Sequence, residues 1–162
     1  MNYKHIILTR FNLQYDLQSN IHIQDSWLEE RFRLFEQYCF PSIIAQTNQQ
    51  FDWVILVSDQ TPKNYLSRLA KHTDSHKNIY IELCTYYEDV NVLYNNIGEK
   101  YVHGYDYLLS TRVDNDDMLA KDFVETLQKL LPATHASAVL TFTNGIQWFE
   151  HKDMAFAVAY DR

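Results

Sequence analysis

Residues 108–119, which read LLSTRVDNDDML in one-letter code, indicate the fold of this chain most clearly. The apolar run at 107–113 predicts a buried strand, and the spacing of leucine and phenylalanine over 119–131 predicts a helix. Three carboxylates, Asp114, Asp116 and Asp117, therefore lie where a strand gives way to a helix. In open α/β sheets, ligands bind in the crevice beyond the carboxyl ends of the strands. The stretch thus predicts both an α/β fold and a candidate site.

The three carboxylates allow two interpretations. Asp and Asn are common at helix N-caps and in turns, so a pair of acids here could be purely structural. Three acids this close raise one another's pKa unless a cation or an arginine such as Arg112 neutralises them. Carboxylate oxygens suit hard divalent cations, so a Mg²⁺ or Mn²⁺ ion that also carries a ligand's phosphates is the functional interpretation.

The remainder of the chain alternates predicted strands with predicted helices. Apolar runs predict strands at residues 4–9, 51–58, 79–85, 138–142, 146–149 and 154–160, with a turn at Asn144-Gly145. Helical spacing predicts helices at residues 25–43, 61–72 and 92–102, the first of them kinked or broken at Pro41, and loops at 13–24 and 86–89. This alternation predicts one α/β domain over residues 1–162, with a mostly parallel sheet and helices on both faces.

Composition excludes several classes of function. The net charge of -7 argues against a nucleic-acid partner, which would need a basic surface. The chain has only three glycines, too few for a glycine-rich dinucleotide fingerprint or a phosphate loop. No apolar run reaches the ~20 residues of a membrane span, and the N-terminal apolar run is too short for a signal peptide, so a cytoplasmic location is expected. The two cysteines and seven histidines form no zinc pattern, and we expect the histidines at the surface.

Several motifs resemble one bacterial family, that of the putative rhamnosyltransferases. The resemblance lies in the helix start from Trp27 to Arg31 and Phe35, the helix end at residues 40–47, Phe51-Asp52-Trp53, and residues 111–117. It covers about residues 6–148. It implies a glycosyltransferase with the A-type fold, a Rossmann-like sheet in which an Asp-x-Asp motif and Mn²⁺ or Mg²⁺ hold a nucleotide-sugar diphosphate. A glycan or lipid-linked acceptor at the cell surface would then receive the sugar.

The resemblance also implies roles for individual residues. Asp116 and Asp117 are the candidate metal ligands, and Asp114 is expected near the ribose or a metal-bound water. Thr9 and Arg10 end the first predicted strand and Asp59 ends the second, where this fold contacts the base and ribose. Arg112 is a candidate donor-binding residue, although a buried structural counter-ion to the carboxylates is the interpretation we favour.

Other residues are assigned to packing. Trp27 and Arg31 lie one helical turn apart and are expected to pack within the helix layer. Trp148 could stack on a sugar or be buried in a terminal strand. Chains of this family continue beyond this length, so we expect mainly the donor-binding half here, with the catalytic base unassigned. The alternative is a non-catalytic interaction module whose acidic cluster is structural and whose C-terminal strands form a homo-oligomer.

Overall fold

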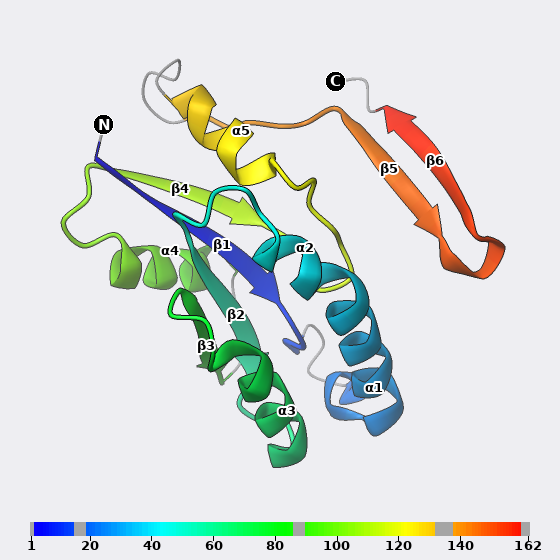
Figure 1. Ribbon diagram of the computed structural model, residues 1–162. Helices are drawn as coiled ribbons and strands as arrows, with labels where there is room; N and C mark the ends of the chain where they lie inside the picture. The colour runs from blue at the N-terminus through cyan, green and yellow to red at the C-terminus, as the bar shows by residue number, and fades with distance from the viewer. Residues whose placement is uncertain (1, 15–18, 86–89, 132–137, 160–162) are drawn as a thin grey trace. The chain divides into compact units, whose positions relative to one another are not determined.

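The computed structural model describes residues 2–14, 19–85, 90–131 and 138–159, with the backbone alone at 90–93 (Figure 1). The predicted loop at 86–89 lies outside these residues. The chain divides into two compact units, residues 1–126 and 127–162. The first unit holds a parallel sheet of four strands in the order β3-β2-β1-β4. Its strands are β1 (Tyr3–Arg10), β2 (Asp52–Ser58), β3 (Ile79–Cys84) and β4 (Tyr107–Arg112).

Helices cover both faces of this sheet, as predicted. One face packs against α1 (Asp25–Leu34), η2 (Phe35–Cys39), α2 (Phe40–Ile44) and α3 (Lys63–Thr73), and the other against α4 (Val90–Tyr101). Successive residues of the central strands serve opposite faces. Ile7 and Trp53 belong to the first core cluster, whereas Ile6 and Val54 belong to the second. This parallel sheet between two helix layers is Rossmann-like.

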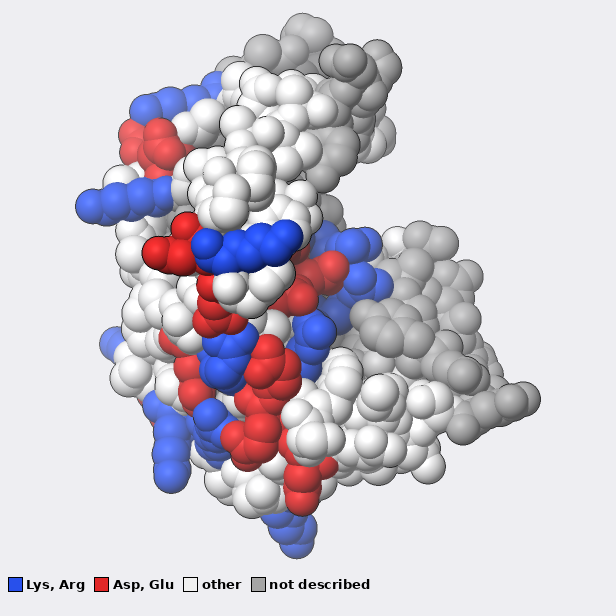
Figure 2. All heavy atoms as spheres, turned by 90° about the vertical axis from the view of Figure 1, so that its right-hand side faces the viewer, with Lys and Arg blue, Asp and Glu red and all other residues white. Residues whose placement is uncertain are grey.

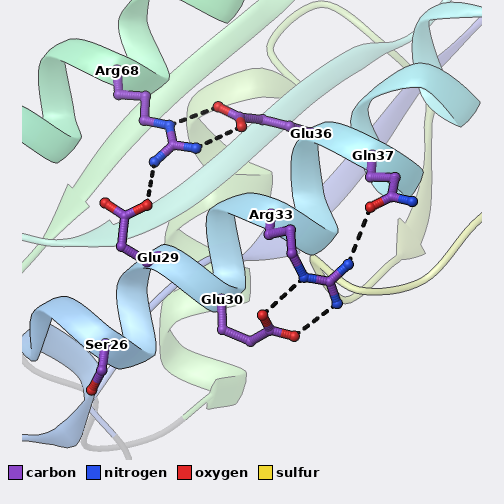
Figure 3. A pocket seen from close by; sticks show the side chains of 7 residues that line it. All are labelled: Ser26, Glu29, Glu30, Arg33, Glu36, Gln37 and Arg68. Carbon is purple, nitrogen blue, oxygen red and sulfur yellow. Dashed lines mark hydrogen bonds and ion pairs between the residues drawn. The ribbon is translucent and has the colours of Figure 1, made fainter. Parts of the chain in front are cut away.

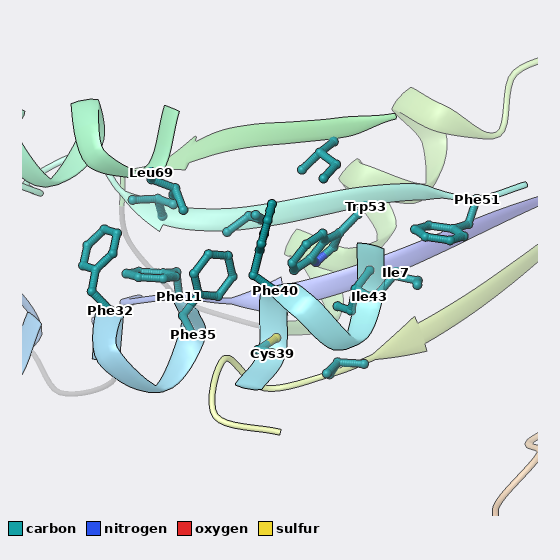
Figure 4. Packing of buried hydrophobic residues seen from close by; sticks show 14 of the residues in the cluster. Ile7, Phe11, Phe32, Phe35, Cys39, Phe40, Ile43, Phe51, Trp53 and Leu69 are labelled. Atoms are coloured by element: carbon teal, nitrogen blue, oxygen red, sulfur yellow. The ribbon is translucent and has the colours of Figure 1, made fainter. Parts of the chain in front are cut away.

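The larger core cluster is built on aromatic rings (Figure 4). Trp53 is fully buried, and its ring centroid lies 5.7 Å from that of Phe35. Phe11, just beyond β1, lies 4.7 Å from Phe32 and 5.2 Å from Phe35, both on the helix layer. These rings bury large apolar areas and pack in tilted and edge-on pairs, the arrangements that aromatic side chains prefer. They therefore fix the first helix layer against the end of β1, where the candidate site begins.

The first helix layer does not break at Pro41. The chain stays helical from Asp25 to Ile44, with a π-helical turn at Phe35–Cys39 directly before the proline. Proline lacks an N–H group and its ring clashes with the preceding turn of an α-helix. Prolines and π-turns are each common sites of irregularity in a helix, and here the two lie close together within one continuous helical stretch.

Helix α5 (Phe123–Leu130) begins four residues later than its predicted start at Leu119. The intervening backbone bonds to the α2 region instead. Leu119 N–H donates to Ser42 Oγ, and the Ala120 carbonyl accepts from Gln46 Nε2 at 2.8 Å. Gln46 Oε1 then accepts from the Val124 N–H at 3.0 Å. A residue from a distant segment thus satisfies a donor that would otherwise be open at the helix start.

The second unit holds an antiparallel hairpin of β5 (Asn144–Phe149) and β6 (Met154–Ala159). The predicted strand at 138–142 is wrong, because these residues pair with no strand in the described part of the chain. The predicted turn at Asn144-Gly145 is also wrong, since Asn144 pairs with Ala159 inside the hairpin. The actual turn contains η4 (Glu150–Lys152) and Asp153, whose φ of 50° lies in the left-handed region that Asp tolerates.

Two burial predictions are also corrected. Strand β4 was expected to be buried, yet Tyr107 and Leu108 are 48% and 42% exposed. Among the described strands β4 pairs only with β1, so it is an edge strand. His5 and His22, expected at the surface, are buried, at 1% and 3% exposure. His5 lies on the central strand, and His22 lies in the short helix η1 (Ile21–Ile23) within the predicted 13–24 loop.

Candidate functional site

The candidate site lies at the carboxyl ends of the parallel strands. Arg10 ends β1, Asp59 follows β2, and the acidic loop, defined here as residues 113–118, follows β4. Because β2, β1 and β4 are parallel neighbours, these residues all lie where the strands end, at the same side of the sheet. Asp59 is exposed, and its backbone N–H donates to the Cys84 carbonyl. The carboxylates that the sequence placed at a strand end are therefore at the edge where α/β proteins bind ligands.

Asp114 contacts two arginines. Arg10 Nη2 lies 3.1 Å from one of its carboxylate oxygens, and Arg112 Nη2 lies 3.2 Å from the other. Arg10 is largely buried, with 16% of its side chain exposed, whereas Arg112 is 54% exposed. Arg112 is therefore a counter-ion to the acidic loop, as expected, but the expectation that it is buried is wrong. It extends from an edge strand into solvent, and Arg10 is the buried partner.

Asn115 holds the acidic loop onto the sheet. Its Nδ2 donates a 2.9 Å hydrogen bond to the Phe11 carbonyl, and its side chain is buried. One residue before the acids, the Val113 N–H donates to the Leu8 carbonyl at 3.0 Å. Both contacts join the loop to β1 or its immediate extension. The three carboxylates are thus carried on a loop whose backbone is fixed at two points.

Helix α1 contributes Arg31 to the same cluster. From the sequence, Arg31 was expected only to pack within the helix layer. Arg31 Nη1 lies 2.7 Å from Asp116 Oδ2 and 3.4 Å from Asn115 Oδ1. Trp27 does pack as expected, with the Arg31 guanidinium 5.2 Å from its ring centroid. Sequence spacing revealed the Trp27 contact because it lies one helical turn away. It contained no signal for the Asp116 contact, which joins residues 85 positions apart.

Asp117 is the carboxylate that forms no ion pair within the described residues. Its side chain is exposed, and its backbone N–H donates to the Asp114 carbonyl at 3.1 Å. Partial removal from water, followed by repulsion from Asp116 and Asp114, raises its pKa above the usual value. Asp117 is thus the one carboxylate of the loop without an arginine partner in the described residues, although three arginines lie nearby.

Thr9, a predicted donor-binding residue, lies in the core. It is fully buried, and its hydroxyl accepts a 2.9 Å hydrogen bond from Trp53 Nε1. Thr9 and Arg10 alternate along β1, so their side chains leave opposite faces of the sheet. Arg10, Arg112 and the three acids thus lie together, whereas the Thr9 side chain lies in the core against Trp53.

A buried polar group missed by the sequence analysis lies beyond the ends of β1 and β2. Asn12 Nδ2 donates to Thr61 Oγ1 at 2.7 Å and to the His22 carbonyl at 3.0 Å. Its Oδ1 accepts from the Ser58 N–H at 3.2 Å. One asparagine therefore joins three segments next to the candidate site, and asparagine after a strand carries no sequence signal that separates this role from a turn.

A separate hollow lies over α1 and α3, on a face where acidic and basic side chains are interspersed (Figures 2 and 3). It is lined by Ser26, Glu29, Glu30, Arg33, Glu36, Gln37 and Arg68. Arg68 donates to both oxygens of Glu36, at 2.8 and 2.7 Å, and to Glu29 at 2.9 Å. Arg33 similarly binds both oxygens of Glu30. The charged side chains that line the hollow are thus paired with one another. We therefore interpret the hollow as a contact between helices and not as the candidate site.

In the described residues, no three or more His, Cys, Asp or Glu side chains are grouped closely enough to enclose a metal ion by themselves. Within the same residues, no helix combines the length and apolar character needed to cross a membrane.

Comparison with known proteins adds one clear finding. The model of the family described as "putative rhamnosyl transferase" matches residues 5–161, almost the whole chain. No curated protein sequence matches the chain at a level that indicates a relative. The Rossmann-like sheet is consistent with this match. The chain belongs to the putative rhamnosyl transferase family, a glycosyltransferase family.

Proposed function

We propose that this chain binds a nucleotide-sugar donor with Mg²⁺ or Mn²⁺ at the acidic loop and acts in transfer of the sugar. The observation that carries the proposal is Asp117, an exposed carboxylate with no ion pair in the described chain, in the loop that follows the carboxyl end of β4. Membership of the rhamnosyl transferase family supports a deoxysugar donor. A glycan or lipid-linked molecule at the cell surface is the proposed acceptor.

The donor set fits a hard divalent cation. Mg²⁺ in nucleotide sites is usually held by one or two carboxylates together with substrate phosphates, and not by an all-protein cage. Asp116 and Asp117 would supply the two carboxylates. When bound, the cation would neutralise charge that develops on the diphosphate leaving group. The lack of a three-residue cage in the described chain is the arrangement expected for a site completed by its ligand.

The chain's own arginines would bind and orient the donor. Arg10 and Arg112 flank Asp114, so their positive charges lie beside the place where a diphosphate would meet the acidic loop. Guanidinium groups match phosphate oxygens in charge and geometry. Asp114 would orient these arginines and meet the ribose, and Asp59 would meet the ribose or base from the end of β2. Thr9, whose hydroxyl is bound to Trp53 in the core, is not proposed to contact the donor.

Titration calorimetry of the 162-residue chain with UDP, dTDP and GDP, each with and without Mn²⁺, tests donor binding. The proposal predicts that at least one nucleotide binds only when the metal is present. Turnover is tested separately by release of the nucleoside diphosphate from a matching nucleotide sugar. A folded chain that binds none of the three nucleotides would contradict the proposal.

A second candidate is favoured by two other observations. Arginines already pair with Asp114 and Asp116, as expected of a structural cluster. In addition, the β5–β6 hairpin exposes apolar side chains, among them Ile146 at 79% and Phe156 at 45%. A non-catalytic module that associates with a second copy through this hairpin would show concentration-dependent association in sedimentation experiments and no metal-dependent nucleotide binding. These two measurements distinguish the candidates.

A further inference from the structure

We propose that Arg31 is a donor-binding residue that neutralises Asp116 in the free protein and turns to the donor's diphosphate when a cation takes that carboxylate. The inference rests on the proposed function above and adds a residue from helix α1 to the site. The family resemblance assigns no such role to Arg31. In this proposal the Arg31 guanidinium and the cation bind the Asp116 carboxylate in turn.

The geometry places Arg31 in competition with a cation. Its Nη1 lies 2.7 Å from Asp116 Oδ2, so the guanidinium binds one of the two carboxylate oxygens. Asp116 is 38% exposed and Arg31 28% exposed, so the pair can be separated without opening the core. A carboxylate oxygen that accepts this charge-assisted bond is less available as a metal ligand. Free protein should therefore bind Mn²⁺ more weakly than two adjacent carboxylates otherwise would.

Arg31 is also held where a released guanidinium would stay at the site. Trp27 stacks on it from the preceding helical turn, with the guanidinium carbon 5.2 Å from the ring centroid. Its Nη1 is 3.4 Å from Asn115 Oδ1, the side chain that fixes the acidic loop. The Nε of Arg31 is buried and has no hydrogen-bond partner among the described residues. In the present arrangement this N–H is shielded from solvent, and it could donate to a phosphate oxygen only after the guanidinium turns away from Asp116.

The two states make opposite predictions for one substitution. Arg31→Gln removes the competitor, so Mn²⁺ alone should bind roughly 3- to 10-fold more tightly, the effect of losing one part-exposed charged contact. The same substitution removes a phosphate ligand, so pyrophosphate in saturating Mn²⁺ should bind about tenfold more weakly. A residue that only packs against the acidic loop would weaken both affinities or neither.

The matched control is Arg33→Gln. Arg33 lies on the same helix and pairs with Glu30 at 2.9 Å on an exposed face, away from the acidic loop. Mn²⁺ affinity is measured from the electron paramagnetic resonance signal of free Mn²⁺, and pyrophosphate affinity by calorimetry. Circular dichroism confirms that each variant is folded. Arg31→Lys is the second variant, which keeps the charge and the apolar stem if Arg31→Gln does not fold.

Each outcome has a defined meaning. Tighter Mn²⁺ binding together with weaker pyrophosphate binding in Arg31→Gln, with Arg33→Gln unchanged, supports the inference. In the Asp116→Asn background the effect of Arg31→Gln on Mn²⁺ should vanish, because the contested carboxylate is gone. If wild-type protein binds Mn²⁺ and pyrophosphate but Arg31→Gln changes neither affinity, the inference fails while the proposed function stands. If wild-type protein binds no nucleoside diphosphate with Mn²⁺, both fail.

Discussion

The side-chain amide of Asn115 donates a 2.9 Å hydrogen bond to the carbonyl of Phe11, 104 residues earlier in the chain. Phe11 in turn packs against Phe32 and Phe35 of the first helix layer. Its own N–H donates to the Leu56 carbonyl at 2.8 Å, which continues the pairing of β1 with β2. The acidic loop is therefore attached to a residue of the larger core cluster.

Asn115→Ala removes the hydrogen bond that attaches the acidic loop to Phe11. The buried Phe11 carbonyl loses its partner, so we expect the free energy of unfolding to fall by about 1–3 kcal/mol. Urea unfolding followed by tryptophan fluorescence measures the change. Asn96→Ala, at an exposed position on α4, should alter stability by only about 0.5 kcal/mol. Equal effects of the two substitutions would show that the Asn115 contact does not stabilise the fold.

Thr9→Val separates a core role from a ligand role. The substitution keeps the shape of the side chain but leaves the buried Trp53 indole N–H without an acceptor, which should cost about 1–3 kcal/mol of stability. Thr9→Ser keeps the hydroxyl and should cost less. Nucleotide affinity per folded molecule should stay unchanged in both variants. A loss of nucleotide affinity at full stability would instead place Thr9 in the binding site.

His5 makes stability depend on pH. Burial lowers its pKa to about 4, against about 6.5 in an unfolded chain. Between these values the unfolded state binds a proton that the folded state does not, so stability falls as the pH drops through this window. The full loss would be about 3 kcal/mol at pH 4, from the difference between the two pKa values.

His5→Gln tests this account. The variant lacks the titrating group, so its stability should change less than that of the wild type between pH 6.5 and pH 4. Thermal unfolding at closely spaced pH values measures both profiles. His103→Gln, at an exposed position, should follow the wild-type profile. Parallel profiles for His5→Gln and the wild type would mean that other groups cause the acid sensitivity.

Sequence patterns predicted the parallel sheet and its helices because hydrophobic periodicity reports burial along one element at a time. All four strands of the first unit, the helical stretch Asp25–Ile44, and α3 and α4 form where expected, with ends shifted by at most two residues. Patterns failed where a distant segment decided the outcome. The start of α5 moved because Ser42 and Gln46 bind the residues before it.

Prediction of the candidate site shows the same division. The acids and Arg10 could be identified because each follows a strand, and parallel strands end at one edge of a sheet. Arg31 and Asn12 could not, since their contacts reach residues 85 and 49 positions away. Arg112 was misjudged because a strand's sequence does not reveal that it lies at an edge of the sheet. The hairpin was misread at Asn144-Gly145 because a turn-forming dipeptide can also occur inside a strand.

The most direct test of metal-dependent donor binding is calorimetry on Asp117→Asn. Wild-type protein is titrated with the nucleoside diphosphate that binds it best, in Mn²⁺ and in EDTA, beside Asp117→Asn and the control Asp122→Asn. Asp122 is exposed and lies outside the acidic loop. We predict that the wild-type protein binds the nucleoside diphosphate in Mn²⁺ but not in EDTA. The affinity in Mn²⁺ should fall about tenfold or more in Asp117→Asn and stay unchanged in Asp122→Asn. Equal affinity in EDTA and Mn²⁺, or full affinity in Asp117→Asn, would contradict the account.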